Sequence, residues 1–440
     1  MRICASLGSV DDVHSGDIEK ADIIEIRTDV FDAVPKNVLR KGQKGLISFK
    51  GDVNASVIPE GWMADIGDAP RSVAGNAASV ISSFHDHDGT PCAEEIIKIL
   101  NGMDGDIVKG AFTVNSVKDV MTLFDVSRLV EKRHVILGMG EVGKITRIRQ
   151  RQMGNEFTFA YLGRPTAPGQ MSVREMNDIG DDGIITGIVG SGIGYTRSPK
   201  MHDAAFRHLA MRGKYLVFDT PSLDRISDLI VDLDVKGVNV TKPYKTEIME
   251  HIDECDGISK RVGAVNTVVN DNGELKGYNT DVHGIMAALK DNSVNVKGKK
   301  VLMLGSGGAA RACAYVLSEN DCEATITGRN HDAVKRIASD FSLTSGERMS
   351  VAVEKYDAVI NCTPLNKNND ISEYPVRIER IRSHQTVFDM VYGETHLNCI
   401  ARKKGCRTVM GEDMLAHQGR MSFELFTSSK VPFGVMRDAV

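Results

Sequence analysis

A lysine lies within an apolar stretch of the sequence that is typical of a buried β-strand. The stretch is GDIVKGAF, residues 105–112, and the lysine is Lys109. Its alkyl chain could pack while the ammonium group reaches water, or the amine could lose its proton and attack a carbonyl carbon. Burial near other cations, such as Arg27 or Arg147, lowers the pKa of a lysine. We therefore expect Lys109 to be a nucleophile that forms a Schiff base with a ketone.

The elements that would position Lys109 are eight short apolar runs that alternate with amphipathic segments. The runs span residues 2–6, 22–27, 44–49, 62–67, 79–84, 106–112, 134–139 and 157–162. Eight strand-then-helix units predict a (β/α)8 TIM barrel, although such barrels usually need about 250 residues. The helix expected between the third and fourth runs is weak.

Polar side chains gather at the carboxyl ends of these runs, where barrel enzymes hold their catalytic residues. His85 would remove a proton from the carbon next to the imine and pass it to a leaving hydroxyl group. Arg147 offers a planar guanidinium group to a substrate carboxylate. His85 and His87 could together bind a metal ion, but no third ligand is apparent, so we predict no metal site. The residues expected at this site are Glu25, Arg27, Lys50, His85, Lys109, Arg147, Thr166 and Gln170.

Five segments of this half resemble type I 3-dehydroquinate dehydratases. They are EIRTD (25–29), SFHD (83–86), DIVK (106–109), GMGEVGKITR (138–147) and TAPGQMS (166–172). The resemblance implies that Lys109 forms the Schiff base, that His85 is the general acid and base, and that the other expected residues bind substrate. The chain departs from the family at Lys50, where arginine is usual, and at Asn54, where a glutamate usually orients the histidine. Both departures predict weaker binding and a less basic His85.

A glycine-rich loop in the second half predicts a dinucleotide site. In KKVLMLGSGGAARACAYVLSE (299–319), a strand-like run is followed by Gly305, Gly307 and Ala310 in the spacing G-x-G-x-x-A, and then by a helix-like run. Such a loop places a pyrophosphate at a helix amino terminus, whereas the alternative is a tight turn without a ligand. The next strand is followed by Arg329 instead of the acidic residue that favours NAD, so the sequence predicts NADP(H).

Hydroxyl, amide and charged side chains precede this loop in four motifs. The motifs are YTRSPKMH (195–202) with Thr196 and Ser198, GVNVTKPYK (237–245) with Lys245, VGAVNTVV (262–269) with Asn266, and GYNTDVHG (277–284) with Asp281. Reduction of a ketone needs a proton for the new alkoxide, and a Lys245–Asp281 pair would supply and orient it. The alternative for each motif is an ordinary turn or helix cap.

Residues 185–430 resemble shikimate dehydrogenases, with SPKMHDAAF, NVTKPYK, GAVNT, GYNTD, GSGGAARA, FDMVY and GEDMLAHQG in the family's order. The resemblance implies that Lys245 and Asp281 are the catalytic pair. It implies substrate contacts from Thr196, Ser198, Thr241, Asn266, Tyr392 and Gln418. It implies cofactor contacts from Gly305, Gly307, Gly308, Ala309, Arg329, Thr363, Gly411 and Met414. Thr196, Gly328 and the segment CTPLNKNND (362–370) depart from the family's usual residues.

The pattern as a whole predicts an α/β protein with a barrel fused to a two-domain unit. We expect residues 1–180 to form the type I 3-dehydroquinate dehydratase-like barrel and residues 185–283 to form a substrate-binding domain. Residues 284–415 would form a Rossmann domain that binds NADP(H), and residues 416–440 a C-terminal helix that returns to the substrate domain.

Composition argues against several other classes of protein. The 440 residues are 42% hydrophobic and 26% charged with a net charge of −5, which indicates neither a nucleic acid nor a membrane partner. We interpret the basic run KITRIRQRQ (144–152) as a solvated face in preference to an RNA site. No apolar run reaches the roughly 20 residues of a membrane helix, and no signal or transit pattern precedes the first strand. Eight cysteines without CxxC spacing indicate reduced thiols, so we expect a cytoplasmic protein.

The two resemblances together imply a bifunctional enzyme of aromatic amino acid biosynthesis. The barrel would dehydrate 3-dehydroquinate to 3-dehydroshikimate, and the second half would reduce that product with NADPH to shikimate. The alternatives are a quinate/shikimate dehydrogenase of quinate catabolism, a regulator that binds these metabolites, and a class I aldolase in the barrel, which the APGQ motif disfavours. The sequence leaves open whether the chain is a monomer or a homodimer.

Overall fold

The computed structural model describes residues 1–440, and the chain divides into two compact units. The first unit comprises residues 1–194 and 211–235, and the second comprises residues 195–210 and 236–440. No helix in either unit combines the length and the apolar character needed to cross a membrane.

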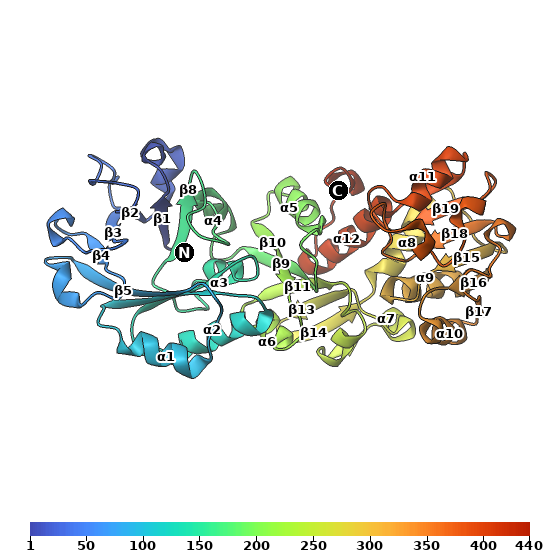
Figure 1. Ribbon diagram of the computed structural model, residues 1–440, viewed down its shortest axis with the longest axis horizontal. Helices are drawn as coiled ribbons and strands as arrows, with labels where there is room; N and C mark the ends of the chain where they lie inside the picture. Colours follow the sequence, from blue (N-terminus) through green and yellow to red (C-terminus); the bar gives the residue numbers. More distant parts are fainter. The chain divides into compact units, whose positions relative to one another are not determined.

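The first unit contains eight parallel strands in a nearly closed barrel, which confirms the predicted fold (Figure 1). The strands are β1 (Ile3–Leu7), β2 (Ile23–Arg27), β3 (Lys44–Ser48), β4 (Met63–Asp65), β5 (Ser79–Asp86), β6 (Ile107–Thr113), β7 (His134–Met139) and β8 (Thr158–Leu162). They pair in the order β7-β6-β5-β4-β3-β2-β1-β8. Buried apolar side chains from these strands, such as Ile23, Leu46 and Val135, form the core inside the sheet. All eight strands therefore present their carboxyl ends at the same face.

The connections between the strands differ in the two halves of this barrel. The four α-helices all follow the later strands: α1 (Ala93–Gly102), α2 (Val117–Leu129), α3 (Lys144–Ile148) and α4 (Val173–Ile179). Only short 3-10 turns occur earlier: η1 (Val10–His14), η2 (Gly16–Lys20), η3 (Ala55–Val57) and η4 (Arg71–Ala74). The expectation of a helix after every strand is therefore wrong for the first half. Pro35 and Gly42, the latter with a φ of +88°, interrupt a helical conformation after β2.

The basic run at residues 144–152 is not the solvated face that its composition indicates. Arg147, Arg149 and Gln150 are all buried. The Arg149 guanidinium group donates hydrogen bonds to the carbonyl oxygens of Leu233 (2.9 Å) and Asp234 (2.6 Å). It donates two longer bonds to the carbonyl oxygens of Asp181 (3.4 Å) and Gly183 (3.3 Å). A buried arginine whose donors reach this many carbonyl groups can be held in the interior. The interpretation as a surface face was therefore wrong.

The rest of the first unit is a short α/β segment that follows the barrel. Strand β9 (Ile184–Gly190) pairs in parallel with β10 (Gly213–Asp219) along their whole lengths. Helix α6 (Ile226–Asp232) follows β10, and the side chain of Arg225 before it forms an ion pair with Asp125 of α2.

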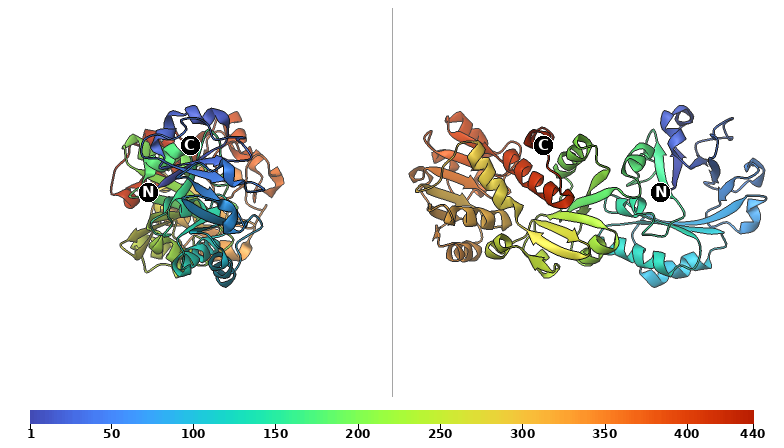
Figure 2. Two further views of the ribbon diagram at one scale, coloured as in Figure 1. Left: turned by 90° about the vertical axis from the view of Figure 1, so that its left-hand side faces the viewer. Right: turned by 180° about the vertical axis from the view of Figure 1, so that it is seen from behind.

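The second unit begins with a small, mostly antiparallel sheet region and its helices. Strands β11 (Val235–Val240), β13 (Thr267–Asp271), β14 (Glu274–Tyr278) and β12 (Glu254–Cys255) are neighbours in this order, and the pair β12 and β14 is parallel. Helix α5 (Ser198–His208), turn η5 (Glu247–Glu250), helix α7 (Gly257–Val262) and helix α8 (Thr280–Asp291) complete it. The long helix α12 (Gly411–Thr427) packs along α8, and α13 (Phe433–Arg437) packs on α5 (Figure 2). The carboxyl-terminal segment thus packs against helices that precede the Rossmann sheet in sequence.

The remaining residues form a six-stranded parallel sheet with helices, the Rossmann arrangement that the glycine loop predicts. The elements in chain order are β15 (Lys300–Leu304), α9 (Gly308–Ser318), β16 (Glu323–Thr327), α10 (His331–Asp340), β17 (Thr344–Ser345), η6 (Val353–Lys355), β18 (Ala358–Asn361), η7 (Ile371–Glu373), η8 (Ile378–Arg380), β19 (Thr386–Asp389), α11 (His396–Lys403) and β20 (Arg407–Met410). The strand order β17-β16-β15-β18-β19-β20 reverses direction between β15 and β18. Dinucleotides bind at such a reversal, beyond the carboxyl ends of the strands.

Candidate active sites

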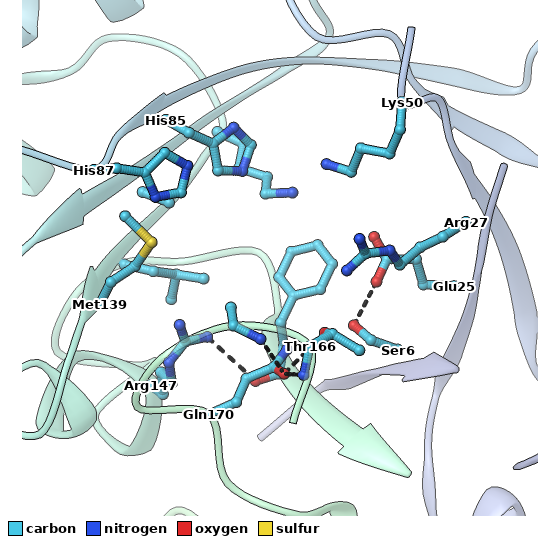
Figure 3. Close-up of a pocket in the computed structure, with 15 residues that line it drawn as sticks. Ser6, Glu25, Arg27, Lys50, His85, His87, Met139, Arg147, Thr166 and Gln170 are labelled. Carbon is cyan, nitrogen blue, oxygen red and sulfur yellow. Dashed lines mark hydrogen bonds between the residues drawn. The ribbon is translucent and has the colours of Figure 1, made fainter. Parts of the chain in front are cut away.

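A cavity of about 330 Å³ lies at the carboxyl ends of the barrel strands (Figure 3). It is lined by Ser6, Glu25, Arg27, Lys50, His85, His87, Lys109, Ala111, Leu137, Met139, Arg147, Phe159, Thr166, Ala167 and Gln170. All eight barrel residues that the sequence analysis proposes for a site are among them. Parallel strands bring them together because each residue follows or ends a different strand of the same sheet.

Lys109 is buried in this cavity on β6 and is paired with a carboxylate that the sequence analysis missed. Its Nζ lies 2.9 Å from Oδ2 of Asp65 and 4.4 Å from the centre of the Phe159 ring. Ser83 Oγ donates to the other oxygen of Asp65 at 2.6 Å. Asp65 ends the fourth strand, so its place at the carboxyl end of an apolar run was the signal that could have revealed it.

The pKa of Lys109 is raised, and the prediction that it is lowered was wrong for the ligand-free site. Burial lowers the pKa of the amine, but the carboxylates of Asp65 and then Glu25 raise it by more. Lys109 is therefore a paired ammonium group before substrate binds, and it must lose a proton before it can attack a carbonyl carbon.

His85 is the candidate for the group that receives this proton. Its pKa is lowered to about 4, first by burial and then by the positive charges of Lys109 and Lys50. The imidazole is therefore neutral near pH 7, the form in which a histidine acts as a base.

Arg147 on α3 brings an almost uncompensated positive charge to the cavity. Its side chain is only 2% exposed, and its Nη1 donates one long hydrogen bond, of 3.4 Å, to the carbonyl oxygen of Phe159. The Nε atom has no partner, and burial lowers the pKa of the group to about 10. A buried guanidinium group without a carboxylate partner is suited to bind a carboxylate of a ligand.

The other polar residues of the cavity are held by their neighbours. Gln170 Oε1 accepts hydrogen bonds from the backbone and hydroxyl of Thr166, at 2.8 and 2.9 Å, and no bond within the chain uses its Nε2. Glu25 accepts from the hydroxyls of Ser6 and Ser48. Arg27 is occupied by both carboxylate oxygens of Asp29.

Asn54 does not line the cavity. Its Oδ1 accepts a hydrogen bond from the backbone of Ser56 at 3.1 Å and caps the short turn η3. No hydrogen bond within the chain therefore orients the His85 ring from this position.

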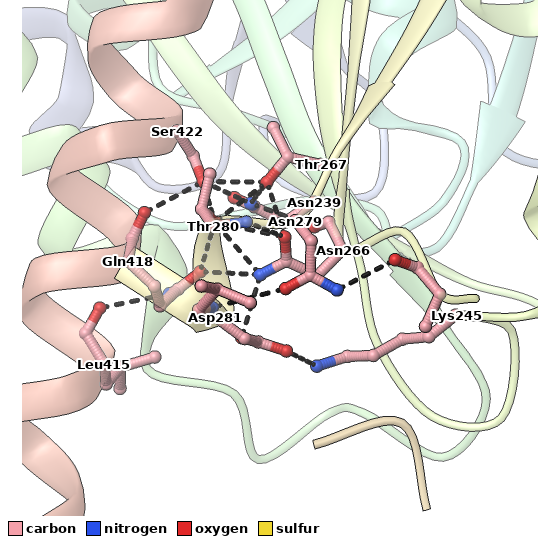
Figure 4. Close-up of polar contacts among 12 residues, drawn as sticks. Asn239, Lys245, Asn266, Thr267, Asn279, Thr280, Asp281, Leu415, Gln418 and Ser422 are labelled. Atoms are coloured by element: carbon pink, nitrogen blue, oxygen red, sulfur yellow. Dashed lines mark hydrogen bonds and ion pairs between the residues drawn. The ribbon is translucent and has the colours of Figure 1, made fainter. Parts of the chain in front are cut away.

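The second unit holds a lysine and an aspartate in direct contact (Figure 4). Lys245 Nζ lies 2.5 Å from Oδ2 of Asp281, and Asn266 Nδ2 donates to Oδ1 of the same carboxylate at 2.8 Å. Lys245 comes from the loop after β11, Asn266 from the residue before β13 and Asp281 from the first turn of α8. A carboxylate in the first turn of a helix is stabilised by the helix dipole.

A network of hydroxyl and amide groups surrounds this pair, and most of it was not found from the sequence. Asn266 Oδ1 accepts from the backbone of Thr280 at 2.7 Å. Thr267 and Ser422 join the network through hydroxyl contacts of 3.0 to 3.1 Å, and Asn239 donates to Ser422 at 2.8 Å. Their signal in the sequence was weak because Ser422 lies far from the others along the chain.

The remaining predicted substrate residues lie in the same unit. Thr196 and Ser198 share a 3.3 Å hydroxyl contact at the start of α5, and Gln418 of α12 lies 3.4 Å from the Asn266 amide. Tyr392 follows β19; burial raises the pKa of its hydroxyl to about 12, and the guanidinium of Arg197 lies 5.2 Å from its ring centre. Thr241 begins the loop that carries Lys245.

A second cavity, of about 290 Å³, lies at the carboxyl ends of β15, β16 and β18. It is lined by Gly305, Ser306, Gly307, Gly328, Arg329, Asn330, Cys362, Thr363, Pro364, Leu365, Glu373 and Pro375. Gly305 has a φ of +109°, and a Cβ there would lie 3.0 Å from the backbone of Cys362. The Arg329 side chain is exposed and forms no hydrogen bond or ion pair with another residue of the chain. The loop geometry, the start of α9 and this available arginine fit a dinucleotide that carries a 2′-phosphate.

The glycine loop also lies against the Lys245 side chain. A Cβ added to Gly308 would lie 2.9 Å from Cδ of Lys245, so the loop and the lysine approach within van der Waals distance. Ala309 follows in α9, Gly411 lies under the Met390–Val391 backbone, and Met414 is buried in the core beside α8. Of the predicted cofactor residues, Gly305, Gly307, Arg329 and Thr363 line the cavity. Gly308 and Ala309 begin α9 directly after the loop, and Gly411 and Met414 do not line the cavity.

Four protein-family models match consecutive parts of the chain. Residues 63–181 match type I 3-dehydroquinase, and residues 188–268 match the shikimate dehydrogenase substrate-binding domain. Residues 287–389 match shikimate/quinate 5-dehydrogenase, and residues 411–440 match the shikimate 5′-dehydrogenase C-terminal domain. The first match begins at β4, so Glu25, Arg27 and Lys50 lie outside it.

Relatives of known name match the same regions. The NADP(+)-dependent shikimate dehydrogenase of Carboxydothermus hydrogenoformans is 37% identical over 269 residues, which cover 58% of this chain and 96% of that protein. The chloroplastic bifunctional 3-dehydroquinate dehydratase/shikimate dehydrogenase of Arabidopsis thaliana is 29% identical over 387 residues, which cover 80% of this chain and 64% of that protein.

A solved structure agrees with the sequence relatives. The shikimate 5-dehydrogenase of Thermus thermophilus, in complex with NADP(H) and shikimate, has a TM-score of 0.52 and 30% identity. The match covers 58% of this chain and 98% of that one. The chain therefore belongs to the shikimate dehydrogenase family and joins it to a type I 3-dehydroquinase domain, the composition of a bifunctional 3-dehydroquinate dehydratase/shikimate dehydrogenase.

Proposed function

We propose that the chain catalyses two successive reactions at its two sites. The barrel dehydrates 3-dehydroquinate to 3-dehydroshikimate, and the second unit reduces 3-dehydroshikimate to shikimate with NADPH. The observation that carries this proposal is that the barrel cavity brings together the buried amine of Lys109, the neutral imidazole of His85 and the guanidinium group of Arg147, which has no carboxylate partner. These are the groups that a Schiff-base dehydration of a carboxylated ketone requires.

In the barrel, the guanidinium group of Arg147 binds the substrate carboxylate. The two opposite charges then compensate each other. Lys109 gives a proton to neutral His85 and attacks the ketone. The imidazolium returns this proton to the carbinolamine hydroxyl, which leaves as water, so that the imine forms and His85 is neutral again. The protonated imine withdraws electrons, so His85 can then remove the proton from the adjacent carbon and return it to the departing hydroxyl group. Asp65 positions Lys109 through the 2.9 Å contact.

In the second unit, Lys245 and Asp281 hold the proton that the new alcohol needs. Asp281 orients the ammonium group of Lys245, and Asn266 fixes Asp281 from the other side. The hydroxyl groups of Thr196, Ser198 and Thr241, the amide of Gln418 and the phenol of Tyr392 bind the hydroxyl and carboxylate groups of the substrate. We infer these roles from the resemblance to shikimate dehydrogenases and from the position of each residue, which lies near the Lys245–Asp281 pair or in the loops that carry it.

NADPH, when bound, supplies the hydride for this reduction. Gly305, Gly307 and Gly308 allow the pyrophosphate to approach the amino terminus of α9, and Ala309 and Thr363 border the same region. Arg329 would bind the 2′-phosphate, and Gly411 and Met414 would also contact the cofactor. We propose residues 1–180, 185–283, 284–415 and 416–440 as the functional divisions, and the cytoplasm as the compartment, because all eight cysteines are free thiols.

Borohydride reduction in the presence of 3-dehydroquinate tests the barrel assignment. Reduction of the imine attaches the substrate permanently to the lysine, and peptide mapping should find the label on Lys109. The matched control is Lys109→Arg, which should lose the label while the dehydrogenase rate is unchanged. Dehydration that proceeds with the label elsewhere, or with none, would reject the assignment.

The variant Lys245→Ala tests the second site. The reduction rate should collapse while NADPH binding, followed by quenching or by calorimetry, stays intact, because Arg329 and the glycine loop are unaltered. Dehydration of 3-dehydroquinate by the same variant serves as the folding control. A variant that keeps its reduction rate would show that the proton comes from another group.

A further inference from the structure

The barrel cavity contains a second imidazole, His87, to which the proposed function gives no role. It lines the same cavity as His85, and the two ring planes lie within 12° of each other with their centres 6.3 Å apart (Figure 3). Parallel rings at this separation do not hydrogen bond directly, but a single water can lie between them.

The local backbone fixes His87 in this position. Strand β5 ends at Asp86, and residues two apart on a strand project from the same face, so His87 follows His85 towards the cavity. Asp86 Oδ1 accepts hydrogen bonds from the backbone of Asp88 and Gly89, at 2.9 and 3.1 Å. Thr113 Oγ1 of β6 donates to the carbonyl oxygen of His87 at 2.9 Å. His87 therefore sits on a defined extension of the sheet.

No carboxylate in the cavity is available to share a proton with His85. Glu25 of β2 is held by two serine hydroxyls, and Asp65 of β4 is held by Lys109 and Ser83. Asp86 is used by the turn after β5. The other charged groups that border the cavity are cations: Arg27 of β2, Lys50 after β3, Lys109 of β6 and Arg147 of α3.

The chemistry nevertheless requires the site to hold a proton for part of each cycle. Lys109 begins as an ammonium group, and its proton must be stored until the hydroxyl of the carbinolamine leaves as water. The proton from the substrate carbon must be stored in the same way until the second hydroxyl leaves. His85 alone is a poor store because it is surrounded by positive charge.

We propose that His87 is the proton relay of the dehydratase site, which exchanges protons with His85 through one bridging water and with bulk water at its outer side. The proposal rests on the proposed function of the barrel. His87 is exposed at the cavity mouth, whereas His85 is half-buried. An imidazolium ion at position 87 is therefore better hydrated than one at position 85.

The relay conserves protons at each step. Neutral His85 takes one proton from Lys109 or from the substrate carbon and becomes an imidazolium. It passes a proton to the bridging water, which gives one to neutral His87, so that His85 is neutral again and His87 is charged. The same path in reverse returns the proton to the hydroxyl group that leaves as water. No oxidant or further reactant is needed.

The test uses two variants of the full chain, His87→Ala and His87→Phe. Both remove the titrating group, and the phenyl ring fills the space while alanine leaves room for free imidazole. We expect kcat of the dehydratase to fall about tenfold or more in both variants, within the range of general acid–base effects. Added imidazole should restore the rate of His87→Ala in proportion to its concentration and should not restore His87→Phe.

Two further measurements separate this inference from the proposed function. Borohydride should still label Lys109 in both variants, and the dehydrogenase rate should be unchanged, which shows that the chain is folded and that the amine is in place. Unchanged dehydratase rates in both variants would overturn the relay. A loss that neither imidazole nor buffer concentration alters would also overturn it, since a structural role alone explains such a loss. Failure of the label in the unaltered chain would instead reject the proposed function.

Discussion

The two sites differ in how their charged groups are compensated before substrate binds. Around Lys245, the ammonium group and the amide of Asn266 both contact the carboxylate of Asp281, and hydroxyl groups complete the network. In the barrel cavity, Lys109 is paired with Asp65 and Arg27 with Asp29, but two other reactive groups have no such partner. Arg147 is buried with one long hydrogen bond, and no group in the chain hydrogen bonds to the His85 ring.

This difference has a physical consequence for each site. A network in which the polar groups already have hydrogen-bond partners keeps its geometry without a ligand and needs little reorganisation during the reaction. A buried cation without a carboxylate partner, such as Arg147, is unfavourable on its own and gains the most from an anionic ligand. The dehydrogenase pair is therefore preorganised by the chain, whereas the barrel site is completed by its substrate.

The largest effect is expected from Asp281→Asn. The change removes the charge that orients Lys245 and leaves an amide next to the amide of Asn266. We expect kcat of shikimate oxidation to fall by about 10²- to 10⁴-fold, the range for general acid–base groups. Steady-state kinetics in both directions measure it, and dehydration by the same variant is the internal control. A loss of less than about tenfold would mean that the pair is not preorganised by Asp281.

In the barrel, Arg147→Met should weaken substrate binding and yet stabilise the fold. The loss of a charge-assisted contact should raise KM for 3-dehydroquinate by about 10- to 100-fold. Because a buried, uncompensated cation is replaced by an apolar side chain, the free energy of unfolding should rise by about 1–3 kcal/mol. Urea unfolding followed by fluorescence measures it, because Trp62, the chain's single tryptophan, is buried next to β4.

The matched control is Asn266→Ala in the other site, where the amide is fully engaged. This change leaves Asp281 and Thr280 without a donor or acceptor, so the second unit should lose about 1–3 kcal/mol of stability. Loss of NADPH binding in increasing urea reports on that unit. Destabilisation by both variants, or by neither, would contradict the contrast between the two sites.

The pH dependence of the dehydratase should show a base that is hard to protonate. The neutral form of His85 is active and is present above its pKa, which burial, Lys109 and Lys50 lower to about 4. The value of kcat/KM should therefore fall only as the pH decreases towards about 4, whereas a solvated imidazole would lose activity near about 6.5. A profile measured in buffers of constant ionic strength decides between them. An acidic limb near neutral pH would show that His85 is solvated or that another base acts.

The smallest effect is expected at the cofactor. Arg329→Ala should raise KM for NADPH by about tenfold and leave KM for NADH unchanged, because an exposed arginine contributes one charged contact to the 2′-phosphate. Initial rates with both nucleotides at saturating 3-dehydroshikimate measure the ratio. Equal changes for the two nucleotides would show that Arg329 does not contact the phosphate.

Much of the fold was predictable because it depends on periodic signals. The eight apolar runs of the barrel and the strand–loop–helix of the glycine motif were found where the structure has them. The missing helix after β2 was harder to predict, since Pro35 and Gly42 act through the local backbone in a segment that still contains apolar residues. The burial of Arg149 could not be predicted, because carbonyl groups from distant residues replace its hydration.

For the sites, the sequence by itself determined which reactive groups are present and which strand each one follows. Lys109, His85 and Arg147 are recognisable because reactive side chains at the ends of apolar runs converge in a parallel barrel. Only the tertiary structure decided their electrostatic state. Asp65 lies 44 positions from Lys109 in the chain and yet contacts it, so the amine is a paired ammonium group. His87 shares a cavity with His85, and Asn54 does not. Such contacts depend on the distances between strands, which cannot be derived from the order of residues along one strand.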